Sequence, residues 1–511
     1  MNRITFNYLI ALLLITSVSL SAQIKRIVNV TNSKEFVNAL QDLKEWDRIN
    51  VLPGEYDFQK RMTVSVAATE RLPITISAKE PGKTIIKNQS WLIFKNSSYI
   101  TIEGFDFQST DGPVIELLGC NNIRITNNTF HLKETVPSIW VMIKGDSDLK
   151  KNTSHHNRVD HNLFENKKLL GNFVTIEGVQ SPEFQVSQHD RIDNNYFRNI
   201  GPRVENVLEA IRVGWADISM SSGFTVIEKN LFEKCDGDPE VVSVKSSDDT
   251  IRYNTFRECL GVLSLRHGNR SYVDGNFFLG NGRTGTFLDS TGKTWTLGTG
   301  GIRFYGDNMK IVNNYFEGLT GQKWDASLAL TSGNTDYGMG MPLTKHYRAR
   351  YTVVAFNTFV NNVSNIEVGY DGDGFQGNWW RLPPVEITVA NNIVVGSNGD
   401  LVKVFQEPIN STWIGNVVSP KDNKAFNRQF KESEVAVADP QLTLIDGIWR
   451  LTKVSPARGR ALGNFPYVSN DVDGQARTNP KDLGCDQVSD SPSVNKPLTK
   501  NDVGPDWINF K

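Results

Sequence analysis

One short theme recurs along most of this 511-residue chain and limits what the chain can fold into. Two alternating apolar residues are followed by a polar pair that contains asparagine, and then by an aromatic or apolar residue. Because the alternation has a period of two residues, it indicates strands rather than helices. The theme is found in NIRITNNTF (122–130), HNRVDHNLF (156–164), DRIDNNYF (190–197), TVIEKNLF (225–232), TIRYNTF (250–256), SYVDGNFF (271–278), MKIVNNYF (309–316), YTVVAFNTF (351–359) and EITVANNIV (386–394).

The spacing of this theme predicts a solenoid. The recurring asparagines from Asn128 to Asn357 are separated by 34, 33, 35, 24, 22, 38 and 43 residues. A unit of about 22 residues made of short strands, with loops inserted in the longer units, is typical of stacked coils. Coils about 4.8 Å apart give an all-β, single-domain, right-handed parallel β-helix. Each recurring asparagine is expected to stack on its neighbours as an amide ladder.

The two ends of the chain fit this architecture. SKEFVNALQDL (33–43) places apolar residues at helical spacing, and we expect a helical cap over the first coil with Ser33 as its N-cap. DPQLTLIDGIWRLTKVSPARGRA (439–461) resembles further coil sequence, and the residues after it become polar. The expected organisation is a signal peptide over 1–22, a β-helix domain over 23–488 and a polar tail over 489–511.

The first residues are typical of a cleaved secretory signal peptide. An early positive charge precedes an apolar run from Leu9 to Val18, and small residues follow at Ser21 and Ala22. The run is too short to span a membrane, and the sequence beyond it has no apolar run of spanning length. The protein is therefore expected to be secreted or periplasmic, without a membrane span.

The charge pattern predicts a local groove for a polyanion. A formal net charge of −1 gives no global basic field, so nucleic acid is not an expected partner. Four cations recur upstream of the asparagines of their coils, about ten residues upstream in the short coils, without interleaved carboxylates, and are expected in a row on one outer face. Stacked like charges repel unless an anion lies over them, although a solvated strand face would show the same pattern. The four are Arg212, Lys245, Arg266 and Arg303.

A candidate metal site lies beside this row. Asn206, Asp238 and Glu240 supply two carboxylates and a side-chain carbonyl, which are hard oxygen ligands suited to Ca²⁺. The alternative is that Asp238 is a turn residue after Gly237 and that Glu240 is an incidental surface residue.

Four cysteines are too few for a disulfide-built scaffold, and none lie in a CxxC pair. Cys235 and Cys259 each follow the asparagine of their coil by five residues, so they are expected to stack on adjacent coils. That spacing is within reach of a disulfide. Two buried free thiols are an equally good interpretation, because adjacent parallel strands often give poor disulfide geometry.

Four segments together resemble polysaccharide lyase family 6, which includes chondroitinase B and many alginate lyases. They are NVLEAIRVG (206–214), DPEVVSVKS (238–246), LRHGN (265–269) and GGIRFYGDNMKIVNNYFEGL (300–319), in the order and approximate spacing of the family. The resemblance covers most of the chain after the signal peptide. It implies a right-handed parallel β-helix that cleaves uronate polymers by β-elimination with Ca²⁺.

The resemblance also implies roles for individual residues. Lys245 matches the catalytic base of the family, and Arg266 matches its second catalytic residue. His267 matches a family residue next to that arginine and is expected, like Arg303, which matches a substrate-groove position, to contact the substrate. Asn206, Asp238 and Glu240 match the calcium ligands, although the family commonly has Glu where this chain has Asp238, and the shorter side chain could weaken or shift the metal.

The substrate expected from the resemblance is alginate, because GGIRFYGDNMKIVNNYFEGLTG and the insertion with PLTKHYRARYTVV (342–354) look closer to the alginate-lyase branch. A dermatan sulfate lyase and a non-catalytic glycan-binding β-helix stay as alternatives. A hydrolase would need two carboxylates facing each other across the glycosidic bond, which Lys245 and Arg266 do not supply. Aromatic side chains that could stack on sugar rings or pack in loops are Trp324, Tyr347, Trp379 and Trp380.

Overall fold

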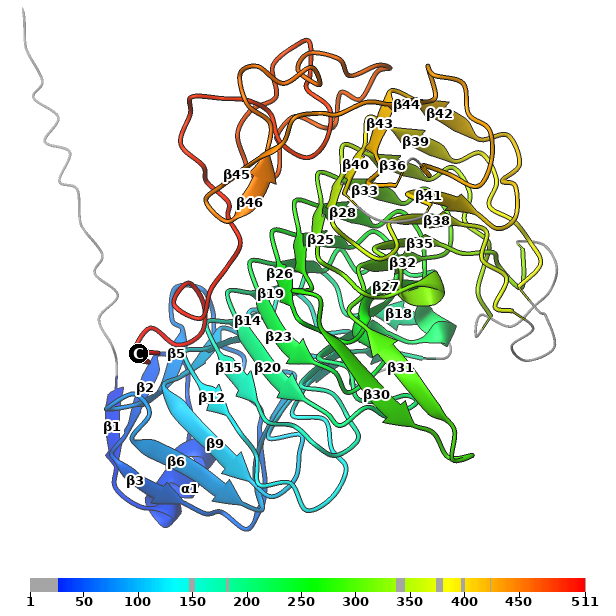
Figure 1. Ribbon diagram of the computed structural model, residues 1–511. Coiled ribbons are helices and arrows are strands. Elements are labelled where there is room, and N and C mark those ends of the chain that lie inside the picture. The colour runs from blue at the N-terminus through cyan, green and yellow to red at the C-terminus, as the bar shows by residue number, and fades with distance from the viewer. Residues whose placement is uncertain are drawn as a thin grey trace, which may run out of the picture.

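The computed structural model describes residues 26–146, 152–180, 183–336, 345–373, 380–396, 400–422 and 424–510. The chain winds into a stack of coils, and successive coils add one strand to each of three long parallel sheets (Figure 1). The predicted right-handed parallel β-helix is therefore confirmed. The signal peptide expected over 1–22 lies outside the described residues. Within those residues, no helix is both long and apolar enough to cross a membrane.

Sheet A has 14 strands. Its order is β1 (Arg26–Val30), β2 (Asp47–Val51), β5 (Ile74–Ala78), β8 (Ile100–Glu103), β11 (Arg124–Thr126), β14 (Arg158–Asp160), β19 (Arg191–Asp193), β22 (Val226–Glu228), β25 (Thr250–Arg252), β28 (Tyr272–Asp274), β33 (Lys310–Val312), β36 (Val353–Ala355), β39 (Thr388–Ala390) and β42 (Thr412–Ile414).

Sheet B also has 14 strands. Its order is β3 (Gly54–Tyr56), β6 (Thr84–Asn88), β9 (Phe105–Ser109), β12 (Thr129–Phe130), β15 (Leu163–Glu165), β20 (Tyr196–Ile200), β23 (Leu231–Cys235), β26 (Thr255–Arg257), β29 (Phe277–Leu279), β34 (Tyr315–Glu317), β37 (Thr358–Val360), β40 (Ile393–Val395), β43 (Asn416–Ser419) and β44 (Val435–Val437).

Sheet C has 12 strands. Its order is β4 (Lys60–Val64), β7 (Ser90–Lys95), β10 (Ile115–Leu118), β13 (Val141–Lys144), β16 (Val174–Ile176), β21 (Ile211–Gly214), β24 (Glu240–Lys245), β27 (Val262–His267), β32 (Ile302–Phe304), β35 (Leu328–Leu330), β38 (Ile366–Val368) and β41 (Val402–Val404).

Three antiparallel pairs and three helical segments complete the described structure. The pairs are β17 (Gly178–Val179) with β18 (Gln185–Val186), β30 (Thr284–Leu288) with β31 (Thr294–Gly298), and β45 (Thr443–Ile445) with β46 (Ile448–Arg450). The helical segments are α1 (Ser33–Gln41) and two 3₁₀ turns, η1 (Ala216–Ile218) and η2 (Lys323–Asp325).

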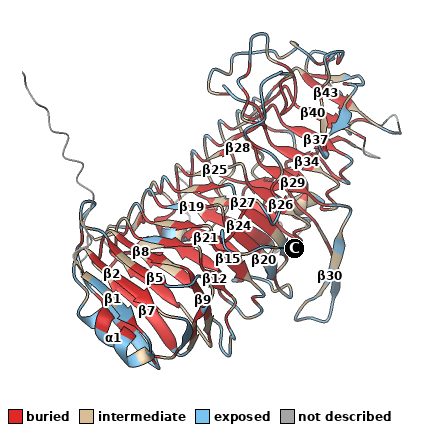
Figure 2. Cartoon of the chain, turned by 90° about the vertical axis from the view of Figure 1, so that its left-hand side faces the viewer, coloured by how far each residue is buried: buried red, intermediate tan, exposed pale blue. Residues whose placement is uncertain are grey.

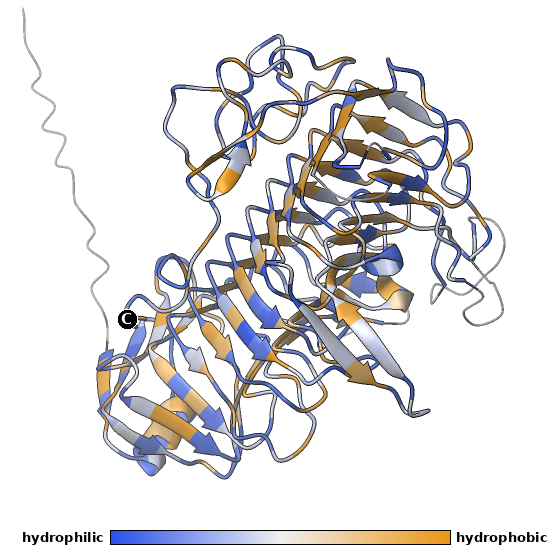
Figure 3. Cartoon of the chain, in the orientation of Figure 1, coloured by the Kyte–Doolittle hydropathy of each residue, from blue (hydrophilic) through white to orange (hydrophobic). Residues whose placement is uncertain are grey.

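The core lies inside the stack, where the apolar face of every sheet is buried (Figure 2). The strands alternate hydrophobic and hydrophilic residues, as the banded ribbons of Figure 3 show, because successive side chains of a strand point to opposite faces. Phenylalanines of sheet B stack on one another with ring centroids 4.5 to 5.1 Å apart. Those rings explain the aromatic residue of the theme and are Phe107, Phe130, Phe164, Phe197, Phe232, Phe256, Phe278, Phe316 and Phe359.

The predicted amide ladder is present at the turn between sheets A and B. Each ladder asparagine donates from Nδ2 to Oδ1 of the asparagine in the next coil, at 2.9 to 3.1 Å. The ladder begins at Asn128 and continues past Asn357 to Asn392 and Asn416. Because these amides are buried, every unmade bond would cost free energy, and the ladder therefore fixes the register of the coils.

The helix α1 covers the first coils with Phe36, Ala39 and Leu40 buried. Its N-cap is Asn32 rather than the predicted Ser33, because Asn32 Oδ1 accepts from the backbone N–H of Glu35 at 3.0 Å. The Ser33 hydroxyl instead accepts from the backbone N–H of Asp57 at 2.9 Å. The helix still packs its apolar side against the stack, as predicted.

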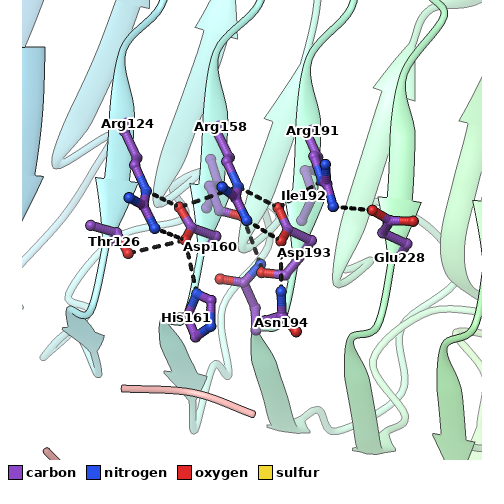
Figure 4. A network of polar contacts seen from close by, with 12 residues as sticks. Arg124, Thr126, Arg158, Asp160, His161, Arg191, Ile192, Asp193, Asn194 and Glu228 are labelled. Carbon is purple, nitrogen blue, oxygen red and sulfur yellow. Dashed lines mark hydrogen bonds and ion pairs between the residues drawn. The ribbon is translucent and has the colours of Figure 1, made fainter. Parts of the chain in front are cut away.

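The outer face of sheet A carries a ladder of ion pairs (Figure 4). Arginines of successive strands lie in register, and each reaches the carboxylate two positions further on in the next coil. The cations of this face are thus neutralised within the protein. The pairs are Arg124 with Asp160, Arg158 with Asp193 and Arg191 with Glu228.

The chain leaves the three sheets after Val437. Residues 439–461, expected to form further coil, instead contain the antiparallel pair β45 and β46, so that expectation is wrong. The expectation fails because alternating apolar residues fit an antiparallel pair of strands as well as a parallel one. A turn at Asp446 and Gly447 joins the two strands, and both residues have positive φ, which permits so tight a reversal.

Residues 484–510, called here the C-terminal strap, run back along the outside of the stack toward its first coils (Figure 1). They include the predicted polar tail. Hydrogen bonds join the strap to the turns between sheets A and B and to the strand starts beside them. The bonds are Cys485 N to Thr358 Oγ1 (2.9 Å), Asn495 Nδ2 to Gly275 O (3.2 Å), Leu498 N to Thr255 Oγ1 (2.8 Å), Gly504 N to Asn194 O (2.9 Å) and Trp507 Nε1 to Asn127 O (2.9 Å).

All four cysteines are buried free thiols. Cys235 and Cys259 lie on adjacent coils, as the spacing predicted, but each thiol donates to a backbone carbonyl of the preceding coil. Cys235 Sγ is 3.6 Å from Phe197 O, and Cys259 Sγ is 3.4 Å from Phe232 O. Of the two interpretations that the sequence left open, the structure has the free thiols.

Candidate active site

Four adjacent strands of sheet C, β21, β24, β27 and β32, carry the candidate catalytic residues, but their register differs from the predicted single row. Arg212 lies opposite Ser243, Ser243 opposite Ser264, and Ser264 opposite Arg303. Lys245 lies two positions further along β24. Arg212 and Arg303 therefore share one column with two serines between them, and Lys245 lies in the next column.

Two irregularities between β24 and β27 move Arg266 out of line with Lys245. The register shifts between Glu240 and Val242 and again between Val244 and Lys245, where Lys245 pairs with His267. Arg266 is consequently an extra residue on β27. Bulges of this kind change the direction of a side chain and are common next to active sites.

Glu240 connects the two columns. Its Oε1 atom accepts hydrogen bonds from Ser264 Oγ at 3.0 Å, Arg266 Nη1 at 3.1 Å and Arg303 Nη2 at 3.0 Å. Burial opposes ionisation of this carboxyl, but the cations of Arg266 and Arg303 hold its pKa well below the usual range. Glu240 is therefore a buried anion held between two arginines.

The expectation of cations without interleaved carboxylates is wrong for a second reason. Arg212 donates from Nε to Glu209 Oε1 at 2.9 Å, and both side chains are buried. Glu209 was not among the predicted site residues. Its position three residues before Arg212 is consistent with an ion pair, because a buried arginine requires a partner. The same spacing occurs on many exposed strands and turns, so it does not identify Glu209 from the sequence.

Asp238 completes a cluster of three buried carboxylates with Glu209 and Glu240. Its oxygens accept from the backbone N–H groups of Glu240 at 2.9 Å and Leu208 at 3.3 Å. Burial, and then the negative charges of Glu209 and Glu240, raise the pKa of Asp238 to about 8. The carboxylates therefore crowd one another, and the protein does not fully neutralise them.

Asn206 lies at the edge of this cluster, in the loop that leads into β21. Its side chain is exposed, and its Oδ1 atom accepts from the backbone N–H of Val207 at 3.0 Å. The next residue, Leu208, donates to Asp238. Asn206 and Asp238 thus lie in neighbouring loops, and Glu240 is the first residue of β24.

The donor set fits a hard cation such as Ca²⁺. Glu209 Oε2 is buried and has no hydrogen-bond partner in the described part of the chain, and the raised pKa of Asp238 marks excess negative charge. Oxygen ligands with excess negative charge are what Ca²⁺ prefers. Within the described residues, no three His, Cys, Asp or Glu side chains are already in position to hold a metal ion. The side chains would therefore have to close around an ion.

Lys245 stands at the outward end of β24 with a half-buried side chain. Among the described residues, its ammonium group makes no hydrogen bond or ion pair. Burial lowers the pKa of Lys245, the carboxylate of Glu240 opposes this shift, and the charge of Arg212 adds to it. A lysine in these surroundings loses its proton more readily than a lysine in water.

Imidazole and aromatic rings line the site on the side of the later coils. The ring of His346 lies 6.0 Å from His267, 4.6 Å from Tyr305 and 5.6 Å from Trp380, measured between centroids. Burial, and then the charge of Arg266, lower the pKa of His346 well below its usual value, so this ring is neutral. His346 was not among the predicted site residues and comes from the insertion between β35 and β36.

The remaining predicted aromatic residues fall in three places. Tyr347 is half-buried next to His346, and its carbonyl oxygen accepts from Gly306 N at 3.1 Å. Trp324 packs edge-on against Trp380 with centroids 5.4 Å apart. Trp379 lies outside the described residues. The described rings thus pack among themselves beside the candidate base.

The hairpin β30–β31 projects from the stack beside the site (Figures 1 and 2). At its base, Arg283 donates to both carboxylate oxygens of Asp236, at 2.8 and 2.6 Å. At its tip, Ser290 Oγ donates to Glu205 Oε1 at 3.3 Å. The hairpin therefore connects the loop that carries Asp238 with the loop that carries Asn206.

Comparison with known proteins places this geometry in a family. The family model for chondroitinase B matches residues 30–449. No curated protein matches the chain. Among solved structures, the family 6 alginate lyase AlyGC is 25% identical, with a TM-score of 0.71, and the match covers 94% of this chain and 59% of that one.

Two further structures share the fold. A family 6 polysaccharide lyase from Pseudopedobacter saltans, Pedsa3628, is 21% identical with a TM-score of 0.66, over 94% of this chain and 100% of that one. A mannuronic acid specific family 6 lyase from human gut microbiota is 22% identical with a TM-score of 0.63, over 80% of this chain and 89% of that one. Since the family model matches well over half of the residues of this chain, the chain belongs to the chondroitinase B family, polysaccharide lyase family 6.

Proposed function

We propose that this protein is a secreted lyase that cleaves alginate by β-elimination and leaves a 4,5-unsaturated uronate at the new end. The observation that carries the proposal is the surroundings of Lys245. This side chain is half-buried, has a lowered pKa and lies beside the ion pair of Arg266 and Glu240. A base and a fixed cation at one position are what β-elimination from a uronate requires.

The base in this mechanism is neutral Lys245. Its amine takes the proton from C5 of the uronate, the C–H electrons form the C4–C5 double bond, and the bond from C4 to the leaving oxygen breaks. The lowered pKa of Lys245 raises the fraction of neutral amine at working pH, and a general base is most effective when its pKa is close to that pH.

Arg266 stabilises the negative charge that develops on the substrate. Its guanidinium is held by Glu240 at 3.1 Å, so the donor is preorganised before the substrate arrives. Donors fixed in advance contribute more than donors that must reorient. The guanidinium stays charged throughout, so the leaving oxygen takes its proton from water.

Ca²⁺ is the proposed cofactor. Asn206, Asp238 and Glu240 would hold it, with the unpaired oxygen of Glu209 alongside. When bound, the ion would neutralise the uronate carboxylate and make the C5 proton more acidic. Glu240 also holds Arg303, so the metal ligands and the arginines are parts of one charge network.

The proposed substrate contacts are Arg212, His267, Arg303 and Tyr347. Arg212 and Arg303 are both buried and bonded to carboxylates, so they act mainly by shaping the positive floor of the groove. His267 lies opposite Lys245 and can reach the same sugar. Because every sugar of alginate carries a carboxylate, alginate suits this arrangement of positively charged side chains.

One assay tests the proposal against its alternatives. The protein without residues 1–22 is incubated with alginate and with dermatan sulfate, and both ultraviolet absorbance and new reducing ends are followed. Elimination from alginate gives both signals, whereas reducing ends without absorbance mean hydrolysis. Absorbance with dermatan sulfate but not with alginate would mean that the protein is a dermatan sulfate lyase. No signal from either polymer would favour a non-catalytic glycan-binding protein.

A further inference from the structure

A polar cavity lies where the C-terminal part of the chain packs against the turn between sheets A and B. Its volume is about 380 Å³, within the range of small-molecule pockets. One wall is Phe356, which follows strand β36 of sheet A. The remaining lining residues belong to the segment 461–481, and among them are Asn464, Phe465, Ser469, Arg477 and Lys481.

Arg477 is a buried cation whose partners are all neutral. Its guanidinium donates to Asn313 Oδ1 at 2.8 Å, Gly484 O at 2.7 Å and Asp482 O at 3.2 Å, and the last two are backbone carbonyls. Its side chain also lies over the ring of Phe356, 4.7 Å from the centroid. With a further bond from Nε to Asn313 Oδ1 at 3.2 Å, these contacts occupy four of its five N–H groups. The carboxylates of Asp471, Asp482 and Asp486 act on its charge without forming an ion pair.

Lys481 supplies a second cation on the same wall. Its Nζ atom donates to the carbonyl oxygens of Phe465 at 2.7 Å and Val468 at 2.6 Å. An ammonium group has three donors, so these two bonds leave one N–H group for a ligand. Lys481 and Arg477 both line the cavity.

No carboxylate forms an ion pair with Arg477 or Lys481 in the described part of the chain. The nearby carboxylates of Asp471 and Asp482 instead accept two or more backbone N–H groups each. Burial lowers the pKa of both cations, and the charge of Arg477 lowers that of Lys481 further. An anion in the cavity would relieve this repulsion.

We propose that this cavity binds the carboxylate of a uronate sugar, as a second glycan site outside the catalytic groove. Arg477 and Lys481 face the carboxylate, and the rings of Phe356 and Phe465, 5.4 Å apart, offer an apolar wall to the sugar ring. The exposed amide of Asn464 and the hydroxyl of Ser469 are available to sugar hydroxyls. The anion site stands on these contacts alone, and its assignment to a uronate rests on the proposed function.

Such a site would hold a segment of polymer away from the reacting bond. Sheet C carries the candidate catalytic residues, and the cavity lies at the turn between the other two sheets, so one sugar cannot occupy both. A polymer bound at the second site raises the local concentration of substrate at the first. The expected effect is a lower KM for long chains without a change in turnover of short ones.

Binding is tested on the full-length mature chain with Lys245→Ala, which prevents turnover, by calorimetric titration with a uronate trisaccharide. We expect two binding events. Asn464→Asp adds a negative charge to a wall residue whose side chain makes no hydrogen bond within the described residues, and it should weaken one event about tenfold. Asn501→Asp makes the same charge change on the strap outside the cavity and should leave both events unchanged.

Lys481→Met provides a second variant, because it removes the charge and keeps most of the side chain. It should remove the same binding event, and a thermal melt shows whether the variant is folded. A single binding event in the Lys245→Ala chain, or two events unaffected by Asn464→Asp, would overturn the proposal. Equal binding of a neutral trisaccharide, or equally strong competition by acetate or phosphate, would overturn the assignment to a uronate. Two binding events, one of them sensitive to Asn464→Asp, together with a wild-type chain that cleaves no polymer, would support the cavity and refute only the proposed function.

Discussion

The ion-pair ladder of sheet A gives a stability prediction that can be worked out from one residue. Asp160 is fully buried and accepts from Arg124 Nε and Nη2 at 2.9 and 2.6 Å, from His161 at 2.8 Å and from Thr126 at 3.2 Å. Burial opposes ionisation, but Arg124 and His161 prevail and lower the pKa of Asp160 from 3.8 to about 2. We predict that Asp160→Asn removes the stabilisation that this shift represents.

The size of the effect follows from linkage between folding and protonation. A shift of almost two units corresponds to about 2.5 kcal/mol, at about 1.36 kcal/mol per unit. A carboxyl whose pKa is lowered by folding stabilises the protein above its unfolded pKa, near 3.8, and loses that contribution as the pH falls toward 2. Wild type and Asp160→Asn should therefore differ by about 2 to 3 kcal/mol at pH 7 and converge near pH 2.

Urea denaturation followed by circular dichroism at several pH values measures this difference. The control is Glu55→Gln, which removes the same charge from a pair with Lys87 whose side chains are 58% and 35% exposed, and it should have little effect. An Asp160→Asn variant as stable as wild type at pH 7 would refute the reasoning. So would a difference that stays constant down to pH 2, since that result would mean that the loss comes from packing and not from charge.

Three further predictions concern the site and the thiols. Lys245→Ala should abolish elimination while leaving the melting temperature unchanged, and wild-type turnover should rise with pH through the lowered pKa of Lys245; normal turnover by the folded variant would exclude it as the base. Added Ca²⁺ should raise the melting temperature of wild type, and Asp238→Asn or Glu209→Gln should require more Ca²⁺ for the same rise, whereas no shift at millimolar Ca²⁺ would contradict the metal site. Thiol titration of the unreduced, denatured chain should find four free thiols, and a count of two would mean that Cys235 and Cys259 are bonded.

The coils could be predicted because their signal is local and repeated. Each ladder asparagine lies next to its own turn and strand, so the theme appears in the sequence every time that the chain makes a coil. The same property predicted the adjacency of Cys235 and Cys259. One aromatic residue two positions after the asparagine is enough to predict the stack of phenylalanines, since the period alone brings their rings together.

The sequence places the four candidate cations on neighbouring coils, but it does not give their register. The register puts Arg212 opposite Ser243 and Arg303 opposite Ser264, two positions before Lys245 and Arg266. A bulge between β24 and β27 then puts His267 rather than Arg266 opposite Lys245. A bulge depends on the partner strand, so no single strand sequence reveals it. Glu209 and His346 were missed because their burial depends on contacts between distant segments, and loop insertions carry no periodic signal.

The C-terminal strap changes how the stack can come apart. In a solenoid each coil contacts only its neighbours, so unfolding can start at an end and proceed coil by coil. Here Asp506 N donates at 3.0 Å to Asn127 Oδ1, a residue 379 positions away, and the ring of Trp507 lies where a side chain at Gly82 would otherwise sit. Early coils cannot fray without releasing the last residues, so the two ends unfold cooperatively. On the ribosome, this cooperativity is absent until synthesis is complete.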